Sequence, residues 1–252
     1  MCRHLAYFGP PTSLAQVVLA PAHGLYEQSW APRLQKHGVV NADGFGVGWY
    51  PAGEDEEPAR YRRSVPIWTD ANLPEMAKAI RSHAVIAAVR SATPGTGQEE
   101  SAAAPFRDGR FLFSHNGVIP DWTNLPTDLT PGEALSLPAR SDSALLWLLI
   151  YRELRRGVAP ERALSSVVAH VAAVRPSARL NLLLTDGRSI VATRFGDTLW
   201  YRSGPDLLVA SEPDDEAVGE WHEVPDHTLL LADQAGVVRT TSLHASYAAA
   251  EK

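Results

Sequence analysis

Cys2 is the residue best suited to covalent chemistry, because it is the only cysteine of the 252 and directly follows the first methionine. Small penultimate residues generally permit removal of an initiator methionine, so we expect Cys2 to become the amino-terminal residue. An ordinary cysteine thiol (pKa about 8.5) can exchange a proton with an α-amine (pKa about 7.7–8.0) near neutrality. A nucleophile and its base on one residue also occur with amino-terminal threonine. Alternatively, Cys2 is a small apolar residue of an edge strand.

Arg90 lies near the end of an apolar run, residues 84–92, that predicts a buried strand. An arginine in that place needs an anionic partner, because burial of an unpaired charge is prohibitive. The partner is either a carboxylate of the protein, in a structural salt bridge, or the carboxylate of a ligand. The sequence leaves both interpretations open.

His115, Asn116 and Gly117 follow an expected strand over residues 110–114. Asn-Gly is typical of a hairpin turn. An amide side chain beside a glycine N–H also brings two donors to one point, which is the arrangement that an oxyanion requires. Asp142 precedes an apolar, and therefore buried, helix expected over residues 144–156. At the least, Asp142 is the N-cap of that helix.

Residues 41–50 contain Phe45, Val47 and Trp49 in alternation with glycines, including Gly48. This pattern predicts a strand with one bare face, which another backbone or a substrate can approach closely. The spacing differs from the G-x-G-x-x-G of a phosphate-binding loop, and no helix follows.

The remaining pattern places strands first, helices in the middle and strands last. We expect a strand over 2–8 that ends at Gly9-Pro10-Pro11, and strands over 180–185 and 189–195 joined by a hairpin turn at Asp186-Gly187. We expect helices over 13–19 and 72–81, capped by Ser13 and Asn72, and another from Pro160. This order favours one domain of two packed sheets with helices outside.

Composition excludes several classes of function. A net charge of −6 argues against a nucleic-acid-binding protein, which should carry a basic patch. One cysteine permits neither an internal disulfide nor a multi-cysteine zinc site, and the nine histidines form no H-x-x-x-H pair. The most apolar run, residues 144–150, is too short to span a bilayer. We therefore expect a cytoplasmic protein without cofactor, metal or membrane partner; a homo-oligomer stays open.

Five motifs occur in order: Cys2, residues 41–50, Arg-Ser-Ala-Thr at 90–93, His-Asn-Gly at 115–117 and Ser-Asp-Ser at 141–143. Together they resemble the class II glutamine amidotransferases, a branch of the amino-terminal-nucleophile hydrolases. The resemblance implies an α+β fold, the αββα four-layer sandwich, with residues 2–252 as a single type-2 domain.

Four further segments resemble one subgroup, the ergothioneine-pathway amidohydrolases: residues 1–5, 28–33, 35–38 and 99–106. That subgroup hydrolyses γ-glutamyl-hercynylcysteine sulfoxide to glutamate and hercynylcysteine sulfoxide. Typical glutamine amidotransferases have His-x-Arg-Trp-Ala-Thr-His-Gly around the arginine, whereas this chain has Ser91 and Pro94 there, so free glutamine is not the expected substrate. The alternatives are a hydrolase of glutathione-like peptides, a glutaminase subunit that feeds a separate synthase, and a non-catalytic γ-glutamyl-binding domain.

The resemblance also implies a role for each site residue. Cys2 forms a thioester, Asn116 and Gly117 hold the oxyanion, Arg90 binds the substrate α-carboxylate and Asp142 binds its α-ammonium. The pocket is completed by Thr93, His115, Gly48 and Trp49. Tryptophans near loops are candidates to bind the trimethylammonium of the leaving group through their aromatic faces: Trp30, Trp49, Trp68 and Trp122.

Overall fold

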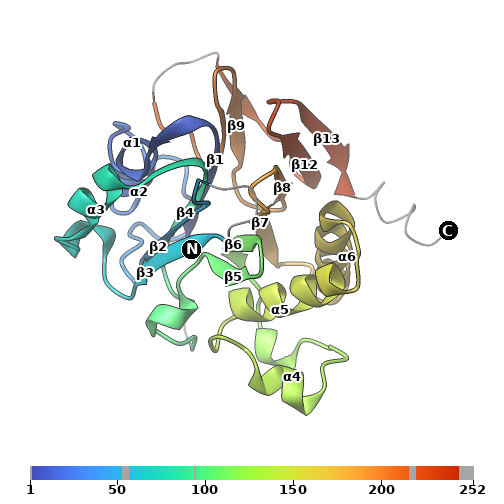
Figure 1. The fold of residues 1–252 in the computed structure, drawn as a ribbon. Helices are drawn as coiled ribbons and strands as arrows, with labels where there is room; N and C mark the ends of the chain where they lie inside the picture. The colour runs from blue at the N-terminus through green and yellow to red at the C-terminus, as the bar shows by residue number, and fades with distance from the viewer. Residues whose placement is uncertain (1, 53–56, 94, 216–219, 244–252) are drawn as a thin grey trace.

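The computed structural model describes residues 2–52, 57–93, 95–215 and 220–243, which form two antiparallel sheets packed face to face (Figure 1). The first sheet has the order β11-β9-β10-β1-β4-β2-β3. Its strands are β1 (Arg3–Ser13), β2 (Phe45–Trp49), β3 (Ala59–Arg63), β4 (Arg81–Val89), β9 (Trp200–Ser203), β10 (Leu207–Ala210) and β11 (Trp221–Glu223). The second sheet has the order β13-β12-β8-β7-β6-β5. Its strands are β5 (Phe106–Asp108), β6 (Phe111–Val118), β7 (Arg179–Thr185), β8 (Ser189–Arg194), β12 (Thr228–Asp233) and β13 (Val238–Ser242).

Helices cover the outer face of each sheet, on opposite sides of the molecule (Figure 1). The first sheet is covered by α1 (Leu14–Val18), α2 (Leu25–Gln28) and α3 (Leu73–Ala79), and the second by α5 (Asp142–Arg155) and α6 (Pro160–Val174). A short α4 (Pro131–Leu135) precedes α5, and single 3-10 turns lie at η1 (Ile67–Thr69), η2 (Glu100–Ala102) and η3 (Trp122–Asn124). The predicted α+β fold, an αββα sandwich, is confirmed.

Three apolar clusters follow from the alternation of side chains along the strands. Leu5 and Tyr7 of β1 face the helices of the first sheet, whereas Ala6 and Phe8 face the second sheet. The cluster between the sheets joins residues of both, such as Ile86 of β4 and Leu183 of β7. A third cluster lies between the second sheet and helices α5 and α6. Both sheets are therefore held rigidly against each other, which fixes residues that project between them.

β1 runs further than the sequence predicts. It continues through Gly9-Pro10-Pro11 to Ser13, and its register against β4 shifts between Phe8 and Thr12. Such an irregularity accommodates prolines, because the ladder there does not need their missing N–H groups. The expected end at residue 8 is therefore wrong, and β1 is a long strand in the middle of its sheet.

The predicted helix starts are confirmed in part. Ser13 caps α1 by accepting a hydrogen bond from the Gln16 N–H at 3.3 Å. Asn72 makes no side-chain cap of α3; the Asp70 carboxylate instead accepts from Leu73 N at 3.1 Å. α6 begins at Pro160, as expected.

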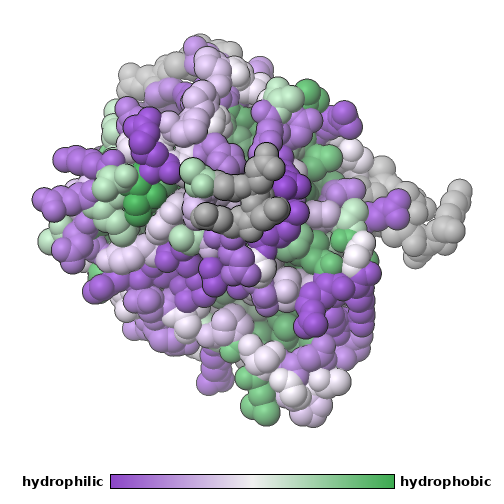
Figure 2. Space-filling model, in the orientation of Figure 1, coloured by the Kyte–Doolittle hydropathy of each residue, from purple (hydrophilic) through white to green (hydrophobic). Residues whose placement is uncertain are grey.

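The surface is hydrophilic over most of the face in Figure 2, with hydrophobic residues in small separate patches. Within the described ranges, no helix is long and apolar enough to cross a membrane. Among the exposed large hydrophobic side chains, Leu34, Val39 and Val40 lie in one segment of chain.

Candidate active site

Cys2 is placed between the two sheets by the pleat of β1. It lies on the same side of the strand as Ala6 and Phe8, which face the second sheet. Its backbone N–H donates to Asn116 Oδ1 of β6 at 3.2 Å, and its Sγ lies 4.0 Å from the Ser91 carbonyl oxygen, after β4. Three strands from both sheets thus meet at the one cysteine of the chain.

Asn116 is a buried amide with one atom left unsatisfied. The side chain is fully buried, and its Nδ2 has no hydrogen-bond partner among the described residues. Its orientation is fixed, because Oδ1 must face the N–H of Cys2. An orphaned buried donor is rare in a folded protein and calls for an explanation. Negative charge that develops on an oxygen next to Cys2 Sγ would satisfy it.

Gly117 continues β6 rather than making a turn. Asn116 pairs with Asn181 of β7, and Gly117 pairs with Leu180, so the hairpin interpretation of Asn-Gly is wrong. A Cβ at Gly117 would collide with the carbonyl oxygen of Arg179 and would lie 2.6 Å from His115 Nε2. Only glycine fits between these neighbours.

Arg90 is buried and bound only by neutral acceptors. Its guanidinium donates to the carbonyl oxygen of Gly97 at 2.7 Å, to Thr96 Oγ1 at 3.1 Å and to the carbonyl oxygen of Asp43 at 3.4 Å. No ion pair of Arg90 is found in the part of the chain that the structure describes, so of the two interpretations left open by the sequence the structural salt bridge is not observed there. Thr93 shapes the same loop, because its carbonyl accepts from Thr96 Oγ1 at 2.7 Å. The contacts found for the guanidinium in the described structure are therefore all to uncharged oxygens.

Asp142 is the first residue of α5 and not its cap, which corrects the sequence assignment. Ser141 caps the helix by accepting from Ala144 N at 3.1 Å. The Asp142 carboxylate is 4% exposed and accepts from the backbone N–H groups of Ile119 at 3.0 Å and Ser143 at 2.8 Å. Among the described side chains, no lysine, arginine or histidine forms an ion pair with it. Its negative charge can therefore receive a ligand cation.

His115 positions its neighbours. Its Nε2 lies 2.9 Å from the Arg179 carbonyl oxygen, which only accepts, so Nε2 carries the proton. Nδ1 then accepts from Ser143 Oγ at 3.0 Å, and this bond holds the residue next to Asp142. With both ring nitrogens bound to protein, His115 supports the predicted site without a free polar atom to contact a ligand.

Gly48 and Trp49 lie elsewhere. Gly48 pairs with Ile86, which pairs with Ala6, four residues beyond Cys2. At about 3.3 Å per residue this is about 13 Å along the sheet. A Cβ at Gly48 would lie 2.8 Å from Leu112 Cδ1, so protein from the second sheet packs against the bare face of β2. The register contradicts the prediction that these two residues line the pocket around Cys2.

The tryptophans proposed for the leaving group all take part in local packing. Trp30 makes edge-on ring contacts with Tyr26 at 4.9 Å and with Trp68 at 5.7 Å. Trp49 and Trp122 pack partly buried against two of the apolar clusters. Trp68 is 38% exposed and keeps part of its ring surface open to solvent.

The sequence reasoning missed two polar residues of β1, Arg3 and His4, that are fully buried beside Cys2. His4 Nδ1 lies 3.1 Å from Ser114 Oγ on β6, two residues before Asn116. The His4–Ser114 pair therefore joins the same two strands as the contact between Cys2 and Asn116. Burial of the ring, with smaller contributions from His115 and Arg3, lowers the pKa of His4 to about 3. The sequence could have indicated their burial, since both are polar residues within an otherwise apolar strand, as Arg90 is.

The buried His4 should make folding sensitive to acid. Its pKa is depressed in the folded state, so its contribution to stability is complete above about pH 6.5 and is lost as the pH falls toward 3. Between pH 7.5 and pH 5 we expect a loss of about 2 kcal/mol in the free energy of unfolding from this group. Urea titrations should show a pH dependence that is smaller by this amount in His4→Gln and unchanged in His170→Gln, a control at an exposed histidine. Equal pH dependence in the two variants would contradict the assignment.

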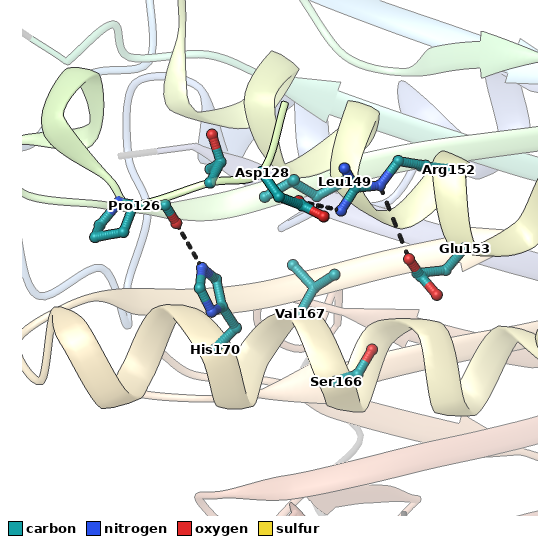
Figure 3. Close-up of a pocket in the computed structure, with 9 residues that line it drawn as sticks. Pro126, Asp128, Leu149, Arg152, Glu153, Ser166, Val167 and His170 are labelled. Carbon is teal, nitrogen blue, oxygen red and sulfur yellow. Dashed lines mark hydrogen bonds and ion pairs between the residues drawn. The ribbon is translucent and has the colours of Figure 1, made fainter. Parts of the chain in front are cut away.

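A cavity of about 600 Å³ lies away from these residues, between α5 and α6 (Figure 3). Arg152 binds Asp128 at 2.7 Å and approaches Glu153 at 3.9 Å, while His170 lies 2.7 Å from the Pro126 carbonyl oxygen. Its charged groups thus pair with one another. Arg152 is ten residues from Asp142 along the helix, about 15 Å. Among the described residues no cluster of three or more histidine, cysteine, aspartate or glutamate side chains could hold a metal ion.

Two facing antiparallel sheets between helical layers make an αββα sandwich, the fold shared with solved class II glutamine amidotransferase structures. The family model described as "Glutamine amidotransferases class-II" matches residues 25–245. The chain belongs to the class II glutamine amidotransferase family.

Curated relatives cover nearly the whole chain. The γ-glutamyl-hercynylcysteine sulfoxide hydrolase of Mycolicibacterium smegmatis is 47% identical over 242 residues, which are 95% of this chain and 99% of the relative. The protein of the same name from Mycobacterium tuberculosis is 42% identical over 241 residues, 95% of this chain and 96% of the relative. Among solved structures, a glutamine aminotransferase class-II domain protein from Silicibacter pomeroyi has a TM-score of 0.68 at 24% identity, covering 96% of this chain and 99% of that one.

Proposed function

We propose that this protein hydrolyses the γ-glutamyl amide bond of γ-glutamyl-hercynylcysteine sulfoxide, in ergothioneine biosynthesis, and releases glutamate and hercynylcysteine sulfoxide. The identity of 42–47% with hydrolases of that name, over 95% of the chain, carries the choice of substrate. Arg90 and Asp142 carry opposite charges, neither is in an ion pair within the described residues, and together they suit the head group of a γ-glutamyl compound. We further propose that residues 2–252 act as one type-2 domain, in the cytoplasm.

In the proposed mechanism, loss of Met1 frees the α-amine of Cys2, which takes the thiol proton through a water molecule. The thiolate attacks the γ-carbonyl carbon, and the carbonyl electron pair moves onto oxygen. Asn116 Nδ2 and the Gly117 N–H bind this oxyanion, which gives the orphaned amide its partner. The ammonium of Cys2 then protonates the leaving amine as the C–N bond breaks. Water hydrolyses the remaining thioester to glutamate and restores the thiol.

Recognition of the glutamyl head supplies the orientation for this attack. The Arg90 guanidinium binds the α-carboxylate, and its fork geometry permits a bidentate pair. Asp142 binds the α-ammonium, with Thr93 beside Arg90 in the same loop. Because both charges sit on the α-carbon, fixing them directs the γ-carbonyl, rather than an α-linked one, toward Cys2.

Arg90→Lys should reduce kcat/KM about 10- to 100-fold, mainly through a higher KM, because a lysine ammonium cannot make the paired contacts of the guanidinium fork. Steady-state kinetics with the γ-glutamyl substrate measure the effect. Arg81→Lys is a matched control at the start of β4, where the exposed Arg81 contacts only the Pro11 carbonyl oxygen in the described structure. Unaltered kinetics in Arg90→Lys would contradict the carboxylate-binding role.

The choice of substrate is tested by parallel turnover assays with γ-glutamyl-hercynylcysteine sulfoxide, glutathione and glutamine. We expect the first to be hydrolysed with the highest kcat/KM. A preference for glutathione would instead identify a hydrolase of glutathione-like peptides. Glutaminase activity that rises on addition of a synthase would identify an ammonia-supplying subunit.

A further inference from the structure

Residues 33–44 pass beside the end of the first sheet at which Cys2 lies. At one side, the N–H groups of Arg33 and Leu34 donate to the Glu212 carboxylate at 3.0 and 2.6 Å, just after β10. At the other side, Asp43 N donates to the Arg90 carbonyl oxygen at 2.8 Å, just after β4. The strand order in this part of the sheet is β10-β1-β4-β2. The chain between Leu34, next to β10, and Asp43, next to β4, must therefore pass across the end of β1.

Gln35 ties this crossing segment to the residue next to the nucleophile. Its Oε1 accepts from Arg3 Nε at 3.2 Å and from Asn41 Nδ2 at 3.0 Å. Arginine only donates, so the orientation of the Gln35 amide is fixed. Its Nε2 donates to the His37 carbonyl oxygen at 3.0 Å. One side chain therefore joins both ends of residues 35–41 and holds them against β1.

Arg3, to which Gln35 is bonded, is a buried charged residue. Arg3 has no exposed surface, its Nη1 donates to Thr198 Oγ1 at 3.3 Å, and its Nη2 finds no hydrogen-bond partner in the described part of the chain. Asn41 is equally buried, and its Nδ2 also donates to the Gln28 carbonyl oxygen at 3.0 Å. The ends of the segment are thus rigid, because moving either would strand buried polar groups.

The middle of the segment, by contrast, is open to solvent. Residues 36–40 are exposed, with Val39 at 71% and Val40 at 44%, beside the polar side chains of Lys36 and His37. The proposed contacts bind the glutamyl head at Arg90 and Asp142, so the leaving group lies beyond the γ-carbonyl carbon that Cys2 attacks, and Gln35 ties the segment to Arg3, the residue that follows Cys2. A fixed backbone that presents a cation, an imidazole and two apolar side chains can contact a large polar amine but offers nothing to ammonia.

We propose that residues 35–41 form the leaving-group side of the site, with Gln35 as the residue that positions them. The segment then selects a large zwitterionic amine as leaving group over ammonia. This inference rests on the proposed γ-glutamyl hydrolase function. Three of the motifs that mark the subgroup in the sequence, at residues 1–5, 28–33 and 35–38, meet in this one network.

The test compares kcat/KM for γ-glutamyl-hercynylcysteine sulfoxide with kcat/KM for glutamine, whose leaving group is ammonia. Gln35→Ala should lower the ratio of the two values about tenfold, because the segment loses its bonds to Arg3 and Asn41. Gln35→Glu keeps an oxygen acceptor for both but loses the donor to the His37 carbonyl oxygen, so it should restore part of the ratio. Gln234→Ala, at a side chain that binds the Gly187 carbonyl oxygen in another part of the fold, should leave it unchanged.

An equal loss on both substrates in Gln35→Ala would show that Gln35 acts on the nucleophile, and would overturn the inference. An unchanged ratio in that variant would overturn it as well. Wild-type protein that fails to hydrolyse the sulfoxide substrate would instead overturn the proposed function, so the two failures are distinguishable.

Discussion

A Cys2→Ala variant is expected to fold and bind substrate normally while hydrolysing it several orders of magnitude more slowly than the wild type, because removal of a covalent nucleophile abolishes the low-barrier route. The thiol is half-buried, and the one hydrogen bond found for it in the described structure is the long contact to Ser91, so stability should change little. Release of glutamate measures the activity, and thermal unfolding measures the fold.

The matched control concerns the α-amine. A chain with an uncleavable extension before Cys2 keeps the thiol and should be equally inactive, whereas removal of the extension by a protease that leaves Cys2 first should restore turnover. Activity in the extended chain would contradict the role of the amine, and activity in Cys2→Ala would contradict the role of the thiol.

Asn116→Ala should reduce kcat about 10²–10³-fold with a small change in KM, because the lost Nδ2 donor serves the oxyanion and not the bound substrate. Nδ2 has no partner in the described structure, so the substitution breaks one hydrogen bond, the 3.2 Å bond from the Cys2 N–H to Oδ1, and should cost less stability than removal of an amide bonded at both ends. Steady-state kinetics and urea unfolding on the same preparation measure both quantities.

Asn181→Ala is the matched control for Asn116, because Asn181 of β7 is its partner in the β6–β7 ladder and is equally buried. Its amide binds the Thr198 carbonyl oxygen at 3.0 Å and the Phe195 N–H at 2.9 Å. We expect this variant to lose stability by about 1–3 kcal/mol, the cost of leaving buried groups unpaired, with a smaller effect on kcat. The reverse outcome, with Asn116→Ala unstable and Asn181→Ala catalytically impaired, would refute the oxyanion assignment.

The layers of the fold could be predicted because local patterns and global topology agree. β2 and α6 each have an apolar face that must be buried, and the Asp186-Gly187 turn joins two strands that pair as a hairpin. Two sheets stacked between layers of helices bury these faces. The end of β1 could not be predicted, because Gly9-Pro10-Pro11 is a turn signal by itself. Pairing of Thr12 and Ser13 with β4, beyond the irregularity, outweighs that local preference.

For the candidate site, too, local sequence patterns point to some residues, while the placement of others depends on strand register. Cys2, Arg90, Asn116 and Asp142 could be proposed from motifs that occur in order along the sequence, and the structure brings Asn116 against Cys2. The catalytic and binding roles of the four residues stay predictions. Gly48 and Trp49 were misplaced, because register determines which end of β2 lies near Cys2, and register depends on partners far along the chain. The Gln35 network was invisible for the same reason, since it joins β1 to a segment more than 30 residues away.

Cys2, as the first residue of the mature chain, should become glutamylated during turnover. Rapid acid quench of the working enzyme, followed by peptide mass spectrometry, detects this covalent intermediate. We expect a glutamyl adduct on a peptide that begins with Cys2, and none in Asn116→Ala at the same early time point. Full turnover by protein whose first peptide still carries Met1, or an adduct on any other residue, would contradict it.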